Sequence, residues 1–189
     1  RGSTELFVYA PDRDGLFATV TAVLDRLRFS VMESRILGSP TGMALDTFLL
    51  LEADSQQPAS AARAEELQQR LQRALSLSTS VQPGKRNMSR HQKHFQMMPR
   101  ISFHAAGDRT QLALVGTDRP GLLAAVAQVM LGEDVRVHDA RIATFGERVE
   151  DFFQLTDRHN APLDAQQQER LLQALLERIG PARDGSPQP

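Results

Sequence analysis

The sequence predicts an α+β protein built from two ferredoxin-like units, each with the order βαββα(β), an antiparallel sheet and helices on one face. The first indication is an internal repeat. Asp12-Arg13-Asp14-Gly15-Leu16-Phe17 returns 106 positions later as Asp118-Arg119-Pro120-Gly121-Leu122-Leu123. A repeat of this length is too long for a solenoid unit and fits a small domain. The second indication is that strand-like and helix-like hydrophobic patterns follow the same order in both halves.

Further echoes extend the repeat along each half. They are Val31 and Val137, Arg35-Ile36 and Arg141-Ile142, and, after a one-residue slip, Asp46-Thr47-Phe48 and Asp151-Phe152-Phe153. Because the repeat includes a polar turn with a glycine as well as apolar periodicity, it indicates a duplicated site within a duplicated fold.

The first half contains five predicted elements. Residues 6–10, 29–37 and 43–51 have strand character, and residues 39–42 form a hairpin turn between the last two. A helix follows the first strand, and a second helix follows Pro58. Their apolar stripes are Leu16, Phe17, Val20, Val23, Leu24 and Leu27, and then Ala64, Leu67, Leu71, Ala74 and Leu75.

The second half repeats this order. Strands are predicted at 111–116, 135–144 and 148–156, with a hairpin at Phe145-Gly146. We expect Gly132 to end the first helix and Pro162 to open the second. The apolar stripes are Leu122, Leu123, Val126, Val129 and Met130, and then Leu171, Leu172, Leu175, Leu176 and Ile179.

An extra strand is predicted at residues 101–104, joined by residues 105–108 to the strand at 111. It can close the first sheet or form a hairpin with the second. The hairpin is favoured because neighbours in sequence usually pair. In that case the edge of the first sheet comes from residues 78–81 or stays open.

These patterns divide the chain into a first unit at 4–81, a basic linker at 82–100 and a second unit at 101–180. Residues 1–3 are interpreted as a cloning remnant and residues 181–189 as a disordered tail. The linker contains Lys85, Arg86, Arg90, His91, Lys93 and His94. A solvated linker is favoured, and a docking strip for an acidic surface is the alternative.

Composition excludes several classes of function. Lys and Arg total 22 against 23 Asp and Glu, so no net field attracts nucleic acid or anionic membrane. The absence of cysteine excludes disulfides, thiolate zinc sites and iron–sulfur clusters, and it fits a cytoplasmic location. No apolar run has the length of about 20 residues that a spanning helix needs. With one Tyr and no Trp, the sheet also lacks an RNA-binding signature.

The repeated Asp-Arg-x-Gly turn is the predicted binding site. It joins a strand to a helix and so presents free backbone N–H groups and the positive end of a helix dipole. Gly15 and Gly121 leave room for a ligand beside the backbone. Pro120 fits the first turn of a helix, and Asp12 and Asp118 can cap the helix or accept from a ligand ammonium. A zwitterionic amino acid fits both features, whereas a purely structural capping turn is the plainer alternative.

The other polar residues give weaker indications of a functional site. His91 and His94 have metal-compatible spacing but no third ligand nearby, so an exposed pair is favoured. His104, His138 and His159 are scattered. Asp46 and Asp151 share a strand face with Phe48 and Phe153. We expect each carboxylate to pair with an arginine, Arg35 or Arg141, and a ligand contact is the alternative.

The second turn and its flanking pattern resemble the signature of ACT domains, which are small regulatory modules that bind amino acids. The first turn resembles it too, with Asp14 where the family usually has proline, so the second site is favoured. The resemblance implies ligand contacts at Asp12, Arg13, Asp14, Gly15, Leu16, Asp118, Arg119, Pro120, Gly121 and Leu122.

Residues 4–180 as a tandem pair, the linker segment Lys93-His94-Phe95 and the strand Ala44-Leu45-Asp46-Thr47-Phe48 resemble the C-terminal region of a bacterial enzyme family that uridylylates and deuridylylates the PII signalling protein. This resemblance implies allosteric sensing of glutamine in nitrogen metabolism. It places the nucleotidyltransferase and hydrolase domains, with their magnesium, upstream, so no catalytic residue, metal or cofactor is expected here.

The partners implied are glutamine or another amino acid, the upstream catalytic domains, PII through them, and a second copy of the chain. The alternative function is a dimerisation or interaction module that binds no ligand. Pairing of the units can occur within one chain or between two.

Overall fold

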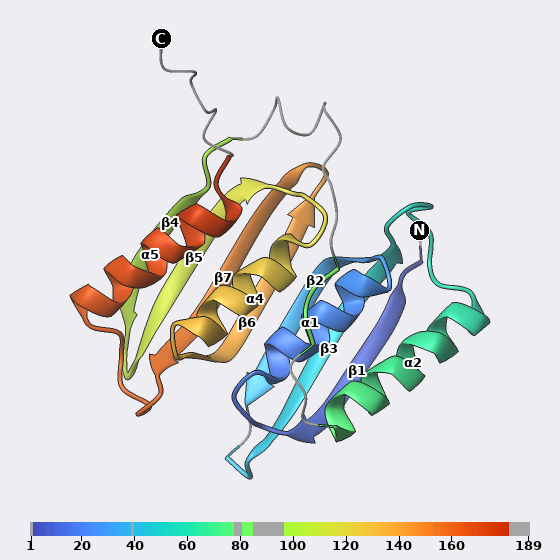
Figure 1. Ribbon diagram of the computed structural model, residues 1–189, viewed down its shortest axis with the longest axis horizontal. Coiled ribbons are helices and arrows are strands. Elements are labelled where there is room, and N and C mark those ends of the chain that lie inside the picture. The colour runs from blue at the N-terminus through green and yellow to red at the C-terminus, as the bar shows by residue number, and fades with distance from the viewer. Residues whose placement is uncertain (1, 39, 78–80, 85–96, 182–189) are drawn as a thin grey trace.

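The two halves of the chain join edge to edge in one antiparallel sheet (Figure 1). This computed structural model describes residues 2–38, 40–77, 81–84 and 97–181. The seven strands have the order β1-β3-β2-β6-β7-β5-β4, and the four described helices all cover one face of the sheet. The predicted α+β class with two ferredoxin-like units is confirmed.

The first unit contains β1 (Thr4–Pro11), α1 (Leu16–Arg26), β2 (Phe29–Gly38), β3 (Met43–Glu52) and α2 (Ala61–Ser76). The second contains β4 (Arg100–Ala106), β5 (Arg109–Thr117), α4 (Leu122–Gly132), β6 (Val135–Phe145), β7 (Arg148–Asp157) and α5 (Ala165–Ile179). β4 pairs with β5 as a hairpin, so this strand extends the second sheet as favoured from the sequence. Residues 78–80, most of the alternative edge of the first sheet, lie outside the described residues.

β2 and β6 join the two units, with residues 33–37 opposite residues 139–143. Arg35 lies directly opposite its repeat equivalent Arg141, so the local two-fold relation between the units passes through this pair. α1 and α4, the two equivalent helices, pack against each other over the join. The units therefore associate side by side within one chain.

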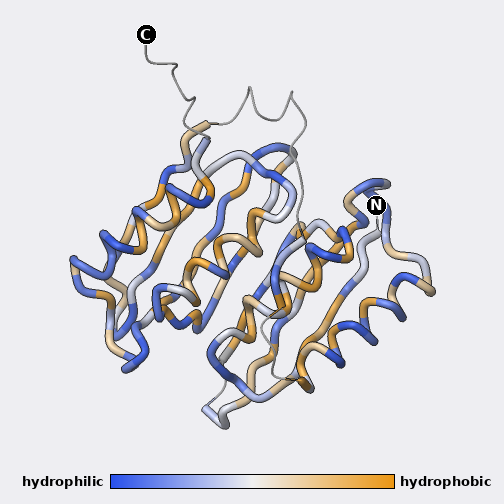
Figure 2. Tube along the Cα trace, viewed as in Figure 1, coloured by the Kyte–Doolittle hydropathy of each residue, from blue (hydrophilic) through white to orange (hydrophobic). Residues whose placement is uncertain are grey.

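The core lies between the sheet and the helices, where the apolar stripes of the helices meet alternate strand residues (Figure 2). Phe17 of α1 contacts Phe153 of β7 in an edge-to-face arrangement, with ring centroids 6.2 Å apart. Because this pair crosses from one unit to the other, the two halves share one continuous core.

α4 ends at Gly132, as predicted, and the left-handed residue lies two positions later at Asp134 (φ 56°). The start of α5 differs from prediction. Pro162 precedes α5 without opening it. Asp164 caps this helix through the amide of Gln167, whose side chain bonds back to the Asp164 amide in a capping box.

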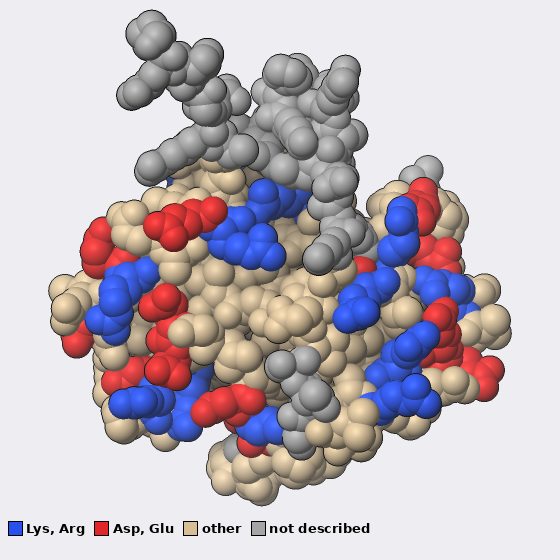
Figure 3. Space-filling model, in the orientation of Figure 1, with Lys and Arg blue, Asp and Glu red and all other residues tan. Residues whose placement is uncertain are grey.

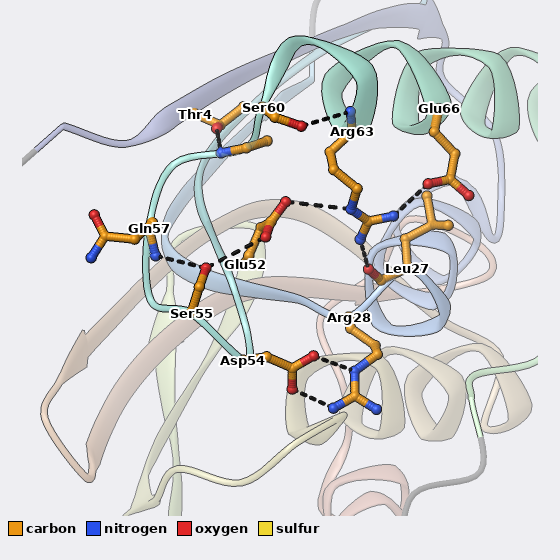
Figure 4. Close-up of polar contacts among 11 residues, drawn as sticks. Thr4, Leu27, Arg28, Glu52, Asp54, Ser55, Gln57, Ser60, Arg63 and Glu66 are labelled. Carbon is orange, nitrogen blue, oxygen red and sulfur yellow. Dashed lines mark hydrogen bonds and ion pairs between the residues drawn. The ribbon is translucent and has the colours of Figure 1, made fainter.

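α2 is fastened by the side chain of Arg63 (Figure 4). The guanidinium reaches Glu52 at 3.4 Å, contacts Glu66, and donates to the carbonyl oxygen of Leu27 at the end of α1. It also lies 5.1 Å from the centroid of the Phe29 ring, a cation–π distance. One arginine thus connects α2, α1, β2 and β3.

None of the helices in the described ranges combines the length and apolar character needed to cross a membrane.

Candidate functional site

Each repeated turn is a type II β-turn that precedes its helix. The amide of Leu122 donates to the carbonyl of Arg119 at 3.1 Å, and Leu16 donates to Arg13 at 3.2 Å. Gly121 (φ 76°, ψ 8°) and Gly15 (φ 82°, ψ 0°) take the third position, where positive φ favours glycine. Pro120 fits the second position, whose φ matches its ring, so it lies in the turn and not in the helix as predicted.

Asp12 and Asp118 hold the turns by their backbones. The Asp12 amide donates to Gly42 at 2.9 Å, and the Asp118 amide donates to Glu147 at 2.8 Å, each at the tip of the unit's next hairpin. Neither aspartate side chain caps its helix, because the N-caps are the turn glycines and neither cap has a side-chain bond. The capping prediction is therefore wrong, and both side chains are exposed at the turn.

The two arginines of the motif brace the turns against the second helix of each unit. Arg13 donates to the carbonyl of Leu75 at 3.1 Å, and Arg119 donates to that of Arg178 at 3.0 Å. These carbonyls lie in the last turns of α2 and α5, where a cation is favoured by the helix dipole. The guanidinium groups therefore position the turns, although both residues also border the cavities described next.

Two cavities lie at the boundary between the units, one beside each turn. The cavity beside Gly121 has a volume of about 480 Å³. The second unit contributes the turn from Asp118 to Leu122 and parts of β6 and β7, and the first unit contributes the end of α1, the start of β2 and the loop at Gln56. Charged side chains on the helical face lie mainly around its periphery, with both signs interspersed (Figure 3).

The cavity beside Gly15 is the repeat equivalent, with a volume of about 360 Å³. Here the first unit supplies the turn from Asp12 to Leu16, and the second supplies the end of α4 and the start of β6. The predicted site residues of the two turns thus fall in two separate cavities, and each cavity needs both units.

A buried aspartate of each unit lines each cavity: Asp151 lies beside Gly121 and Asp46 beside Gly15. Asp46 is 1% exposed and Asp151 is 2% exposed. Burial raises the pKa of each to about 7. The nearby Asp12 carboxylate raises the pKa of Asp46 further, whereas a backbone hydrogen bond from Ala143 partly offsets the rise for Asp151.

The predicted ion pairs of Asp46 and Asp151 with arginine are wrong. Arg35 and Arg141 are exposed and adjoin the buried residues Ile36 and Ile142 along their strands, so their side chains point to the other face of the sheet. Among the described residues, both oxygens of Asp46 and Oδ1 of Asp151 have no hydrogen-bond partner. The alternative from the sequence, a ligand contact, fits the cavity position of Asp151.

Sequence reasoning missed the residues that face each turn from the other unit. The Asp25 carboxylate lies so close to Gly121 that a Cβ there would be 3.2 Å from Oδ1. Asp25 is 5% exposed, and its Oδ2 accepts from the Gly84 amide at 2.8 Å. At Gly15 the facing residue is Leu131, the repeat equivalent of Asp25, with a methyl 3.4 Å from the same point. A comparison of the two copies position by position would have found this difference.

Within the described ranges, no cluster of three or more His, Cys, Asp or Glu residues could hold a metal ion. His91 and His94 lie outside the described residues, as do linker residues 85–96 and residues 182–189 of the tail.

Comparison with known proteins gives the relatives of the chain. No protein-family model matches it. The bifunctional uridylyltransferase/uridylyl-removing enzyme of Xanthomonas campestris pv. campestris (strain B100) is 44% identical over 180 residues, which cover 94% of this chain and 20% of that protein. The chain is a homologue of one segment of this enzyme family. The enzyme of the same name from Stutzerimonas stutzeri (strain A1501) is 39% identical and matches 100% of this chain and 21% of its own length.

The chain therefore spans about a fifth of the length of these relatives. Among solved structures, the aspartate kinase of Synechocystis is 15% identical over 93% of this chain and 27% of its own, with a TM-score of 0.48.

Proposed function

We propose that this chain is the amino-acid-sensing regulatory segment of an enzyme that uridylylates and deuridylylates the PII protein. The homology to uridylyltransferase/uridylyl-removing enzymes supports the parent activity, and the chain matches about a fifth of their length. The observation that carries the sensing role is the cavity beside Gly121, which only the two units together complete.

The chemistry of this cavity suits a zwitterion. The Leu122 amide is bonded to Arg119 and the Ala125 amide to Gly121, which leaves the amides of Leu123 and Ala124 to receive a carboxylate at the positive end of the helix dipole. The carboxylates of Asp25 and Asp151 can receive an ammonium. A volume of about 480 Å³ is within the range of small-molecule sites, roughly 300–1,000 Å³.

Glutamine is the ligand we propose, with the parent's catalytic segments as the recipients of the signal. A ligand that contacts both units favours the arrangement in which they are closed together. Coupling of this kind typically amounts to about 1–3 kcal/mol, enough to shift the balance between two catalytic activities.

Calorimetric titration of the whole chain with each amino acid tests the proposal. We expect heat of binding with glutamine, and at least a tenfold weaker affinity in Asp151→Asn. The matched control is Asp46→Asn, which makes the same change in the other cavity and should bind as the wild type does. Absence of heat and of thermal stabilisation with every amino acid at millimolar concentration would contradict the proposal, because a bound ligand must stabilise the folded state.

A second candidate is an assembly module, favoured by the face of the sheet that none of the described helices covers (Figure 1). Phe7, Tyr9 and Phe145 are large exposed residues, with exposed fractions of 65%, 70% and 64%. Sedimentation velocity over a hundredfold range of concentration distinguishes the two functions. An assembly module associates without any amino acid, and Tyr9→Lys weakens that association.

A further inference from the structure

Among the positions at which the two cavities differ, three related by the repeat bear on charge at the turn. Ser30 at the Gly121 cavity corresponds to Arg136 at the Gly15 cavity, and Pro120 corresponds to Asp14. The third difference is that of Asp25 and Leu131, described above. At the Gly15 cavity, Arg136 takes the place of a small serine and Leu131 that of a carboxylate, while Asp14 takes the place of a proline and pairs with Arg136.

Arg136 and Asp14 form a two-point ion pair across the unit boundary. Nη2 of Arg136 donates to Oδ2 of Asp14 at 3.1 Å, and Nε lies 2.8 Å from Oδ1 but makes no hydrogen bond there. The third nitrogen, Nη1, donates to Oδ1 of Asn160 at 3.1 Å. The guanidinium is thus held by one hydrogen bond to each of two residues and by close ion pairing with Asp14. The guanidinium, on a side chain 34% exposed, thus lies at the wall of the Gly15 cavity, held by residues from both units.

The charges of the two cavities differ as a result. The acidic residues at the Gly121 cavity are Asp25, Asp118, Glu147 and Asp151, and its one cationic residue, Arg119, is directed to a helix carbonyl. At the Gly15 cavity the acidic residues are Asp12, Asp14 and Asp46, and the cationic residues are Arg13 and Arg136. Arg136 pairs with Asp14 at the turn, and the methyl groups of Leu131 replace the carboxylate of Asp25. The Gly121 cavity is therefore the more acidic of the two, and an ammonium group in the Gly15 cavity would lie near the Arg136 guanidinium.

We infer that the duplicated sites have diverged, so that the chain binds one amino acid, beside Gly121, while Arg136 acts in the Gly15 cavity as a built-in cation that clamps the units together. This inference rests on the proposed function for the bound site. The clamp itself depends only on the contacts of Arg136, so the two parts can be tested separately.

Exchange of the differing residues between the cavities tests the claim that the chain binds one amino acid, beside Gly121. Ser30→Arg with Pro120→Asp introduces the clamp beside Gly121 and should abolish the calorimetric signal with glutamine. Arg136→Ser with Asp14→Pro removes the clamp beside Gly15 and should keep one site per chain, with affinity within about threefold of the wild type. Circular dichroism confirms that each variant is folded. Two sites per wild-type chain, or binding lost only in the second variant, would overturn the inference.

Thermal unfolding without ligand tests the clamp. Arg136→Ser should lower the melting temperature by about 1–4 °C, the effect expected of a partly exposed ion pair in a chain of this size. Asp14→Asn should lower it by a similar amount, and the two changes together should add little to either alone. Full additivity of the two shifts overturns the clamp. Absence of glutamine binding in the wild type instead overturns the proposed function and the one-site claim, and leaves the clamp to this second measurement.

Discussion

At the scale of single residues, the two buried aspartates are the clearest departure from an apolar core. Asp46 and Asp151 occupy equivalent positions between core residues of β3 and β7. A carboxyl whose pKa is raised to about 7 is favoured in its protonated form when the chain is folded. Ionisation above that pH therefore destabilises the fold. At Asp151, a ligand ammonium in contact with the carboxylate would offset this loss of stability.

Replacement of Asp46 by Asn should stabilise the protein only at high pH. In the wild type, the folded state holds a proton on Asp46 up to about pH 7, whereas the unfolded chain releases it near pH 4. The contribution of this group to stability therefore falls as pH rises from about 4 to 7. Urea unfolding should show a gain on the order of 1–3 kcal/mol for Asp46→Asn at pH 8 and almost none at pH 4. A gain that is equal at both pH values would refute the raised pKa.

At the scale of elements, arginines tie the second helix of each unit to its surroundings. Arg13 and Arg119 reach the ends of α2 and α5, and Arg63 reaches back from α2 to α1 and β3. The turns that border the cavities are thereby fixed to helices on both sides. The arginine of the motif therefore has a structural role, since its guanidinium holds the turn to the end of the second helix.

Removal of Arg63 should loosen α2. Arg63→Ala loses a hydrogen bond to the Leu27 carbonyl, two carboxylate contacts and the stacking on Phe29, and we expect a loss of about 1–2 kcal/mol in unfolding free energy. Arg70→Ala, an exposed position in the same helix, serves as the control and should change it by less than about 0.5 kcal/mol. Equal effects of the two substitutions would show that the Arg63 contacts add nothing.

The order of the elements could be predicted at this scale because hydrophobic periodicity is local. The stripes at Leu67, Leu71 and Leu175 are buried as expected, and the hairpin of β4 and β5 follows from their short separation. Helix ends were less predictable, since a single residue such as Asp164 outcompeted Pro162 as the start of α5. The position of the turn could be predicted from the repeat. Its type II geometry, which makes the glycines and not the aspartates the N-cap residues, could not be predicted.

At the scale of the whole molecule, the site depends on the join of β2 to β6. No local pattern encodes which strand edges meet, so the residues that complete each cavity from the other unit, Asp25 and Arg136, escaped prediction. The same join places Arg35 opposite Arg141 on the face of the sheet away from the described helices. Like charges directly opposite each other in a sheet are unfavourable.

Reversal of one of these charges should strengthen the join. Arg35→Glu converts the facing pair to opposite charges and should raise the unfolding free energy by about 0.2–1 kcal/mol at low salt. Arg141→Glu should do the same, whereas the double reversal should return to the wild-type value. Stabilisation that survives in the double variant would place the effect elsewhere than in this pair.

The most direct test of the account is a titration of the isotopically labelled chain with glutamine, followed by amide resonances in NMR spectra. The account predicts that the amides of Gly121, Leu123 and Asp25 shift with a common saturation curve, while those of Gly15 and Leu131 remain in place. Shifts confined to Gly15 and Leu131, or no shift at either turn at millimolar glutamine, would contradict it.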